Sequence, residues 1–262
     1  HIHCPHCRNA IEVVDEFPTC DVTCRSCDSN LRLRNGQTLA AWQTSQRPTI
    51  REAVELTVRI ARALHVEHEC GVIHRNLKPG SILLGRDGRP FLMNFGLAKR
   101  ETDEDPTIPA GQVFGTPAYM SPEQARGEGH TADCRTDIYS LGTILFELLT
   151  GERPFRGSAI TLLTQVIHDD PPSPRMLHSQ VPRDIETICL RCLEKEPDKR
   201  YASAAEVADD LQRWLDGKPI QTRAPGPVHV DGGGADGSRG RVDEFRAVTL
   251  VAGMTHGRRV LL

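Results

Sequence analysis

The stretch from residue 74 to residue 84 reads His74-Arg75-Asn76-Leu77-Lys78-Pro79-Gly80-Ser81-Ile82-Leu83-Leu84. Polar and basic side chains stand directly before an apolar run, which predicts a polar loop leading into a short strand near residues 82–84. Two further motifs follow in order: Asn94-Phe95-Gly96, thirteen residues after Ser81, and Gly115-Thr116-Pro117-Ala118-Tyr119-Met120-Ser121-Pro122-Glu123. Hydrophobic patterning alone would not produce three such motifs in order, so they decide the interpretation of the chain.

Helical patterns surround these motifs. Apolar residues at helical spacing predict a helix over residues 51–70, with Gly71 as its C-cap. Further helices are predicted over residues 137–150, 158–168, 184–195 and 203–216, and a second short strand over residues 91–93. The expected fold class is mainly α (α+β).

Together, the three motifs resemble those of eukaryotic-type serine/threonine protein kinases, which read H-R-D-L-K-P-x-N, D-F-G and G-T-x-x-Y-M-[AS]-P-E. The segment that begins at Asp137 is similar to the start of the family's central buried helix. The resemblance covers residues 51–222 and implies the C-terminal lobe of a kinase domain. It also implies ATP and Mg²⁺ as cofactors and a protein as substrate or partner.

The resemblance implies structural and regulatory roles for five residues of this lobe. His74 and Phe95 would stack as part of the regulatory spine, held through Asp137. Arg75 would meet a phosphate on the activation segment, for which Thr107 is a candidate acceptor.

Other matched positions would serve catalysis, nucleotide binding and stability. Lys78 would neutralise charge on the transferred phosphoryl group, and its pairing with Thr116 is the signature of serine/threonine specificity. Leu83 would form the floor under an adenine ring. Glu123 would pair with Arg200.

Three departures from the family pattern fall on catalytic and metal-binding positions. Asn76 occupies the place of the catalytic base, and an amide cannot accept the substrate proton at neutral pH. Asn94 replaces the magnesium-binding aspartate, and Ser81 replaces the asparagine that binds a second metal ion. Mg²⁺ prefers carboxylate and phosphate oxygens, so both metal positions are weakened.

The glycine-rich loop and ATP-anchoring lysine of a kinase N-terminal lobe are missing before residue 71. No lysine precedes Lys78, and the only glycine before Gly71 is Gly36. A kinase-like lobe without this covering would expose Leu83, Phe95 and Ile73 as an apolar face.

The first residues contain two C-x-x-C pairs, formed by Cys4 with Cys7 and by Cys24 with Cys27. This is zinc-ribbon spacing, and four thiolates can complete a tetrahedral zinc site. Cys20 is a nearby substitute ligand, and His3 or His6 could compete. We therefore expect a small β zinc ribbon with structural zinc.

The expected domains are a zinc-ribbon-like module (1–33), a linker (34–50), a kinase-like C-terminal lobe (51–222) and a Gly-rich disordered tail (223–262). The net charge of −3 gives no electrostatic preference for nucleic acid, and no apolar run is long enough to span a membrane. Nine cysteines with clustered spacing favour a reducing, cytoplasmic environment over a disulfide framework.

Three functions remain open on the sequence. The first is a pseudokinase-like scaffold without phosphotransferase activity, and the second is an active ATP-dependent serine/threonine kinase in its intact form. In the third, the zinc ribbon is an interaction module and the kinase remnant is passive. Structural roles are expected for two other features. Cys189 and Cys192 are interpreted as buried packing residues in a helix, and His65 and His68 as surface or capping residues.

Overall fold

The computed structural model describes residues 37–85, 87–93, 115–130 and 132–222. It also gives the backbone of five short strands elsewhere: β1 (Ile2–His3), β2 (Ala10–Ile11), β3 (Thr19–Thr23), β4 (Asn30–Arg34) and β9 (Lys99–Arg100). Of the expected domains, the zinc-ribbon-like module is thus described only as strand backbone, and the tail from residue 223 lies outside the described residues.

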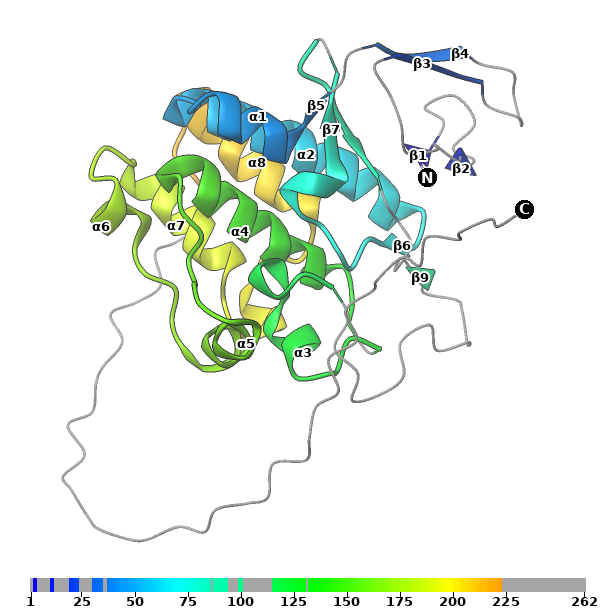
Figure 1. Ribbon diagram of the computed structural model, residues 1–262. Coiled ribbons are helices and arrows are strands. Elements are labelled where there is room, and N and C mark those ends of the chain that lie inside the picture. The colour runs from blue at the N-terminus through cyan, green and yellow to red at the C-terminus, as the bar shows by residue number, and fades with distance from the viewer. Residues whose placement is uncertain are drawn as a thin grey trace, which may run out of the picture.

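A bundle of helices makes up most of the described chain (Figure 1). These are α1 (Leu39–Ser45), α2 (Ile50–Glu69), α3 (Pro122–Ala125), α4 (Arg135–Thr150), α5 (Ala159–His168), α6 (Pro174–Leu177), α7 (Arg183–Cys192) and α8 (Ala204–Leu215). Three single turns of 3₁₀ helix join them: η1 (Pro79–Ser81), η3 (Pro117–Tyr119) and η4 (Pro197–Lys199). The five predicted helices are therefore confirmed, and none of their ends differs from the prediction by more than three residues.

Helix α4 forms the centre of the bundle. Every residue of α4 except Arg135 and Glu147 is buried, and the helix packs against α2 and α7. At Gly142, an added Cβ would lie 2.5 Å from the Cβ of Cys192 on α7. The two helix backbones thus approach closely because position 142 has no side chain.

The interpretation of Cys189 and Cys192 as packing residues is confirmed. Both side chains are fully buried on α7. Burial raises the pKa of both thiols, that of Cys192 to about 12. A protonated, inaccessible thiol behaves as a small apolar side chain.

Local signals explain the ends of α2. Thr49 and Glu52 form a reciprocal capping box at its start, which satisfies two backbone N–H groups that lack helical partners. Beyond its end, Gly71 adopts a φ of 71°, a left-handed conformation that glycine takes without steric cost.

The strands lie beside the helices. Strands β5 (Gln37–Thr38), β7 (Ile82–Leu84) and β8 (Pro90–Leu92) form an antiparallel sheet in the order β5-β7-β8. Strand β6 (Val72–Ile73) pairs with β9, and antiparallel pairs also join β1 to β2 and β3 to β4. The expected mainly α fold with a few short strands is confirmed.

Two expectations are wrong. Residues 34–50, expected as a linker, contain β5 and α1, because Thr38 caps the helix and Leu39 is fully buried against the core. Ile73, expected on an exposed apolar face, is only 3% exposed because β6 pairs with β9 and contacts α2. Leu83 is half-buried.

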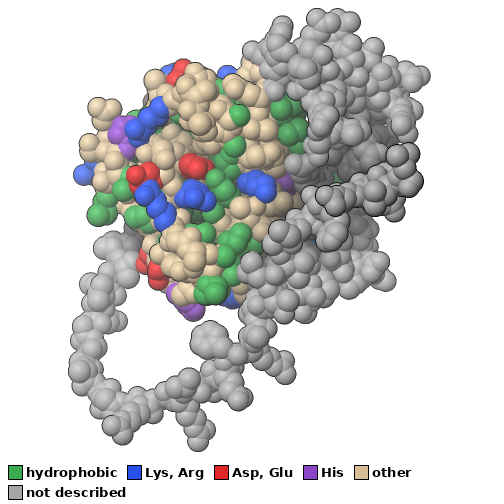
Figure 2. Space-filling view, viewed as in Figure 1, with side chains coloured by type: hydrophobic (Ala, Val, Ile, Leu, Met, Phe, Trp, Pro, Cys, Tyr) green, Lys and Arg blue, Asp and Glu red, His purple; other side chains and the backbone are tan. Residues whose placement is uncertain are grey.

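Within the described ranges, no helix has the length and hydrophobicity needed to cross a bilayer. The face shown in Figure 2 carries basic, acidic and apolar side chains together.

Candidate active site

The loop after β6 is anchored on one buried carboxylate, that of Asp137 in the first turn of α4. Asp137 Oδ2 accepts the backbone N–H of His74 at 2.8 Å, and Oδ1 accepts that of Arg75, also at 2.8 Å. The side chain of Asp137 is fully buried. A carboxylate in such a place is stable only because donors surround it.

Helix α2 supplies a third donor to Asp137. His68 Nε2 lies 2.9 Å from Asp137 Oδ2, and the His68 side chain is 6% exposed. The expectation that His68 is a surface or capping residue is therefore wrong. His65, three residues earlier, has a side chain that is 29% exposed and lies 3.9 Å from Glu69.

Burial and hydrogen bonding set the charges around this anchor. Burial alone would raise the pKa of Asp137, but the hydrogen bonds from His68 and His74 outweigh it and lower the pKa. Burial lowers the pKa of His74 and of Arg75. Asp137 is thus ionised and His74 neutral near pH 7, which suits the contact of His74 Nε2 with Met93 O at 2.9 Å.

Arg75 has a left-handed backbone, with a φ of 61°. A non-glycine residue in this region costs about 1–3 kcal/mol, so surrounding contacts must hold it. Its N–H is held by Asp137, and its carbonyl accepts Gln124 Nε2 at 2.7 Å. The guanidinium is buried and donates to Ala132 O at 3.2 Å. Thr107, the candidate phosphate acceptor, lies outside the described residues.

Lys78 and Thr116, the two residues of the expected specificity signature, are in contact. Lys78 Nζ donates to Thr116 Oγ1 at 2.8 Å. This contact joins the loop after β6 to the segment before η3. The ammonium group of Lys78 is thus fixed beside a hydroxyl.

Asn76 is half-buried in the same loop. Its backbone N–H donates to His74 Nδ1 at 3.3 Å. Its side-chain Oδ1 lies near Gly115: a Cβ built on that glycine would be 3.6 Å from the Asn76 Oδ1 atom. The loop therefore places an amide where the family has a carboxylate.

The hydroxyl of Ser81 is used inside the loop. It accepts the Lys78 N–H at 3.0 Å and lies 2.9 Å from Lys78 O and 3.4 Å from Asn76 O. The residue is fully buried. A hydroxyl with these partners does not fit the role of a metal ligand.

Glu123 and Arg200 form a buried pair away from the loop. Arg200 Nη1 and Nη2 each lie 2.8 Å from a different carboxylate oxygen of Glu123, and Thr136 Oγ1 donates to Oε1 at 2.7 Å. Burial would raise the pKa of Glu123, but the bonds from Arg200 lower it. The guanidinium also stacks on Tyr139, 5.2 Å from the ring centre.

The other predicted site residues are only partly placed. Leu83 lies in the middle strand of the sheet, paired with Thr38 and Phe91. Asn94 and Phe95 lie outside the described residues, as do Cys4, Cys7, Cys24 and Cys27.

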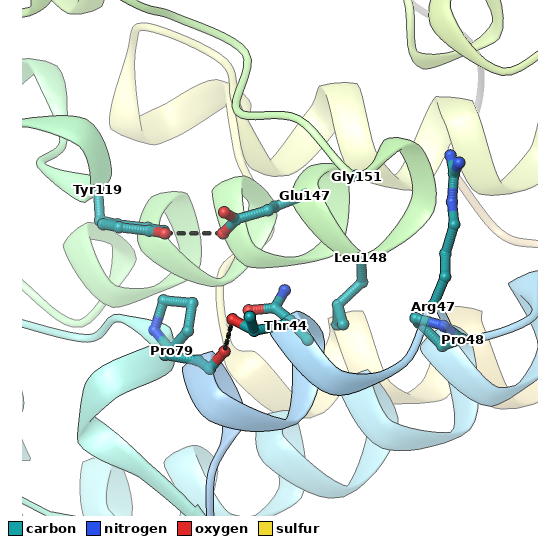
Figure 3. A pocket seen from close by; sticks show the side chains of 10 residues that line it. Thr44, Arg47, Pro48, Pro79, Tyr119, Glu147, Leu148 and Gly151 are labelled. Atoms are coloured by element: carbon teal, nitrogen blue, oxygen red, sulfur yellow. Dashed lines mark hydrogen bonds between the residues drawn. The ribbon is translucent and has the colours of Figure 1, made fainter.

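A cavity of about 350 Å³ adjoins the loop between α1 and α4 (Figure 3). Tyr119 and Glu147 point toward one another on one side, with the hydroxyl donating at 2.7 Å. Arg47 donates to Thr150 O near the opposite end. Sequence reasoning missed this cavity because it treated residues 34–50 as a linker.

Fold and loop together define a protein kinase domain of the serine/threonine type. Residues 31–211 match the protein kinase domain family, and the chain belongs to that family. The match begins before residue 51, where the motifs alone placed its start, and therefore takes in β5 and α1.

Bacterial serine/threonine kinases are among the relatives. A probable serine/threonine-protein kinase of Streptomyces coelicolor is 38% identical over 205 residues, which are 77% of this chain and 30% of that protein. Serine/threonine-protein kinase PknB of Mycolicibacterium smegmatis is 40% identical over 170 residues, 64% of this chain and 27% of that protein. The chain thus spans less than a third of the length of these relatives.

Proposed function

We propose that this chain is a kinase-family scaffold without phosphotransferase activity, acting through contacts with a protein partner. The observation that carries the proposal is a contrast within one loop, between intact folding contacts and a substituted residue at the position of the catalytic base. The contacts that fold the loop are present, from Asp137 to the His74 and Arg75 backbone. The loop they hold presents an amide, Asn76, at the base position.

The loss of the base has a large expected effect on rate. A general base contributes about 10²- to 10⁴-fold to a reaction that needs one. An amide oxygen is not basic enough to replace it at neutral pH. The half-buried Asn76 would therefore hold a substrate hydroxyl without removing its proton.

Metal binding is weakened as well. The buried hydroxyl of Ser81 is engaged with Lys78, so the second metal position does not fit Mg²⁺. Asn94 brings a neutral amide to the first position. ATP binding would rest on Lys78 and Leu83 without the glycine-rich loop and its partner lysine, because this chain has no lysine before Lys78.

A second function is an active serine/threonine kinase in an intact form that includes an N-terminal lobe. The contact between Lys78 Nζ and Thr116 Oγ1 favours it, because both residues stand where the family uses them on the substrate side of the reaction. A glycine-rich loop and its lysine in a longer form of the protein would support this alternative.

Phosphotransfer and nucleotide binding test the two functions. The unmodified chain would be compared with a variant carrying Asn76→Asp and Asn94→Asp, using ATP with and without Mg²⁺ in thermal shift, calorimetry and a peptide phosphorylation assay. A variant with Asn9→Asp and Asn30→Asp has the same charge change outside the kinase motifs and serves as control. We expect no Mg²⁺-dependent binding by the unmodified chain. Phosphorylated peptide from it would refute the scaffold proposal.

We further propose a zinc ribbon as an interaction module at residues 1–33, with Cys4, Cys7, Cys24 and Cys27 holding the metal. The backbone supports this in one respect: Cys4 directly follows β1, and Cys24 directly follows β3. Measurement of bound zinc in the purified chain, with Cys24→Ser as comparison, tests it. One zinc per chain, lost in the variant, is expected.

A further inference from the structure

Helix α5 lies at one edge of the bundle and contributes few buried side chains (Figure 1). Of its ten residues only Leu162 and Val166 are buried, and Ile160 is 76% exposed. The helix packs against α3 and against η3, which carries Tyr119 at the wall of the cavity. What holds α5 in place therefore also bears on that wall.

A lysine from outside α5 reaches the end of this helix. Lys195, which follows α7, donates from Nζ to Val166 O at 2.7 Å and to Gln165 O at 3.3 Å. The last four carbonyls of a helix have no partner in its regular hydrogen-bond pattern, and α5 ends at His168. Lys195 thus supplies donors to carbonyls at the C-terminal end of α5 from a segment 29 residues further along the chain.

Both ends of Lys195 are fixed. Its carbonyl accepts Arg200 Nη2 at 3.0 Å, and the same nitrogen bonds the buried carboxylate of Glu123. Its ammonium nitrogen lies 4.6 Å from the ring centre of Phe155, which is buried ahead of α5. A series of contacts therefore runs from the buried ion pair through Lys195 to α5.

Burial makes the charge of Lys195 costly in this place. The side chain is half-buried, and burial lowers its pKa to about 8. Asp170 and Asp169, directly after α5, favour the charged form. Arg126 and Arg200 oppose it. A neutral amine has two hydrogens for the two carbonyl acceptors, so these hydrogen bonds do not require the charge.

We propose that Lys195 is a proton-sensitive positioning residue for α5, which holds the helix through its two carbonyl contacts and holds it more firmly when the amine is neutral. The sign follows from linkage: a group that binds its proton less tightly in the packed state favours packing as the proton is lost. Packing of α5, and with it of η3, should therefore tighten as the pH rises through about 8. The inference goes beyond the scaffold function, because neither ATP nor the loop after β6 takes part.

Amide hydrogen exchange of α5 on the whole chain tests the proposal, after correction for the intrinsic pH dependence of exchange. In the unmodified chain, protection of α5 should rise about 3- to 10-fold between pH 7 and pH 9, the lower values reflecting the partial exposure of the amine. Protection of α8 serves as the internal reference.

Lys195→Met keeps an apolar side chain and removes the amine. At pH 9 it should lose about 3- to 30-fold of the protection of α5, because Val166 O and Gln165 O lose a donor. Its protection should not rise between pH 7 and pH 9. Lys199→Met, at an exposed position of η4, is the matched control and should keep the pH dependence of the parent.

Three outcomes would overturn the proposal. The first is α5 protection in the unmodified chain that stays level or falls between pH 7 and pH 9. The second is equal protection of α5 in Lys195→Met and the parent at pH 9. The third is an equal loss in α5 and α8 of Lys195→Met, which would indicate general loss of packing.

A titration of the unmodified chain covers the case in which the variant does not fold. The chemical shift of the carbon next to Lys195 Nζ reports protonation of this amine. We expect a midpoint near pH 8, and a midpoint at the usual lysine value of about 10.4 would refute the proposal. None of these results depends on ATP, so they stand apart from the test of phosphotransfer.

Discussion

The buried anchors of the kinase domain and the residues at its reaction centre have kept their family identities to different degrees. Asp137, Glu123 and Arg200 match the family and are fully bonded in the core. Asn76 and Ser81 lie in the loop that Asp137 holds, and they do not match the family. An unpaired buried charge costs several kcal/mol, whereas an altered base costs catalysis but little folding free energy. In this chain the contacts on which folding depends are therefore intact, whereas the residues at the expected catalytic positions differ from the family pattern.

The largest effect should come from breaking an anchor. Arg200→Leu leaves the Glu123 carboxylate buried without its partner, which should lower the free energy of unfolding by about 3–5 kcal/mol. Urea denaturation measures it. The control is Arg135→Leu, whose partner Asp198 is exposed; its side-chain ion pair should be worth under about 1 kcal/mol. Equal losses in the two variants would contradict the distinction between anchor and surface pairs.

The close contact of α4 with α7 should give the next largest effect. Gly142→Ala places a Cβ against Cys192 and should destabilise the fold by about 1–3 kcal/mol through overpacking. Gly80→Ala, in the loop, meets no atom within 4 Å and should be close to neutral. Thermal unfolding of the two variants compares a core position with a loop position directly. A Gly142→Ala variant as stable as the parent would show that the helices separate easily.

Two tyrosine hydroxyls allow a buried group with hydrogen-bond partners to be compared with a buried group that has none. The hydroxyl of Tyr139 is buried without a partner among the described residues, so Tyr139→Phe should be neutral or stabilising by up to about 1 kcal/mol. The hydroxyl of Tyr201 bonds Asp210 at 3.0 Å and Thr222 at 2.8 Å. Tyr201→Phe should therefore cost about 1–2 kcal/mol in urea denaturation. The reverse order of stabilities would refute the assignment of these bonds.

The smallest effect is expected at the reaction centre. Asn76→Asp changes one half-buried side chain and should alter the free energy of unfolding by less than about 1 kcal/mol. The midpoint of urea denaturation at pH 7 measures it. A loss as large as that of Arg200→Leu would mean that position 76 is itself an anchor.

The motifs and helical patterns determined much of the fold before any tertiary contact was known. Apolar spacing located all five predicted helices, because burial of one helix face follows a local period. The sequence also determined the kinase family and the places where it departs from it, Asn76 and Ser81, because residue identity is fully visible in the chain.

Only the tertiary structure decided what each of these residues touches. His68 was indistinguishable from a surface histidine until α2 and α4 were brought together, and Ser81 looked like a weak metal ligand until its hydroxyl was found engaged with Lys78. Residues 34–50 seemed a linker because their packing partners lie elsewhere in the chain. Local periodicity reports which face of an element is buried, but the partner that buries it, and the hydrogen bonds made there, depend on residues far away in sequence.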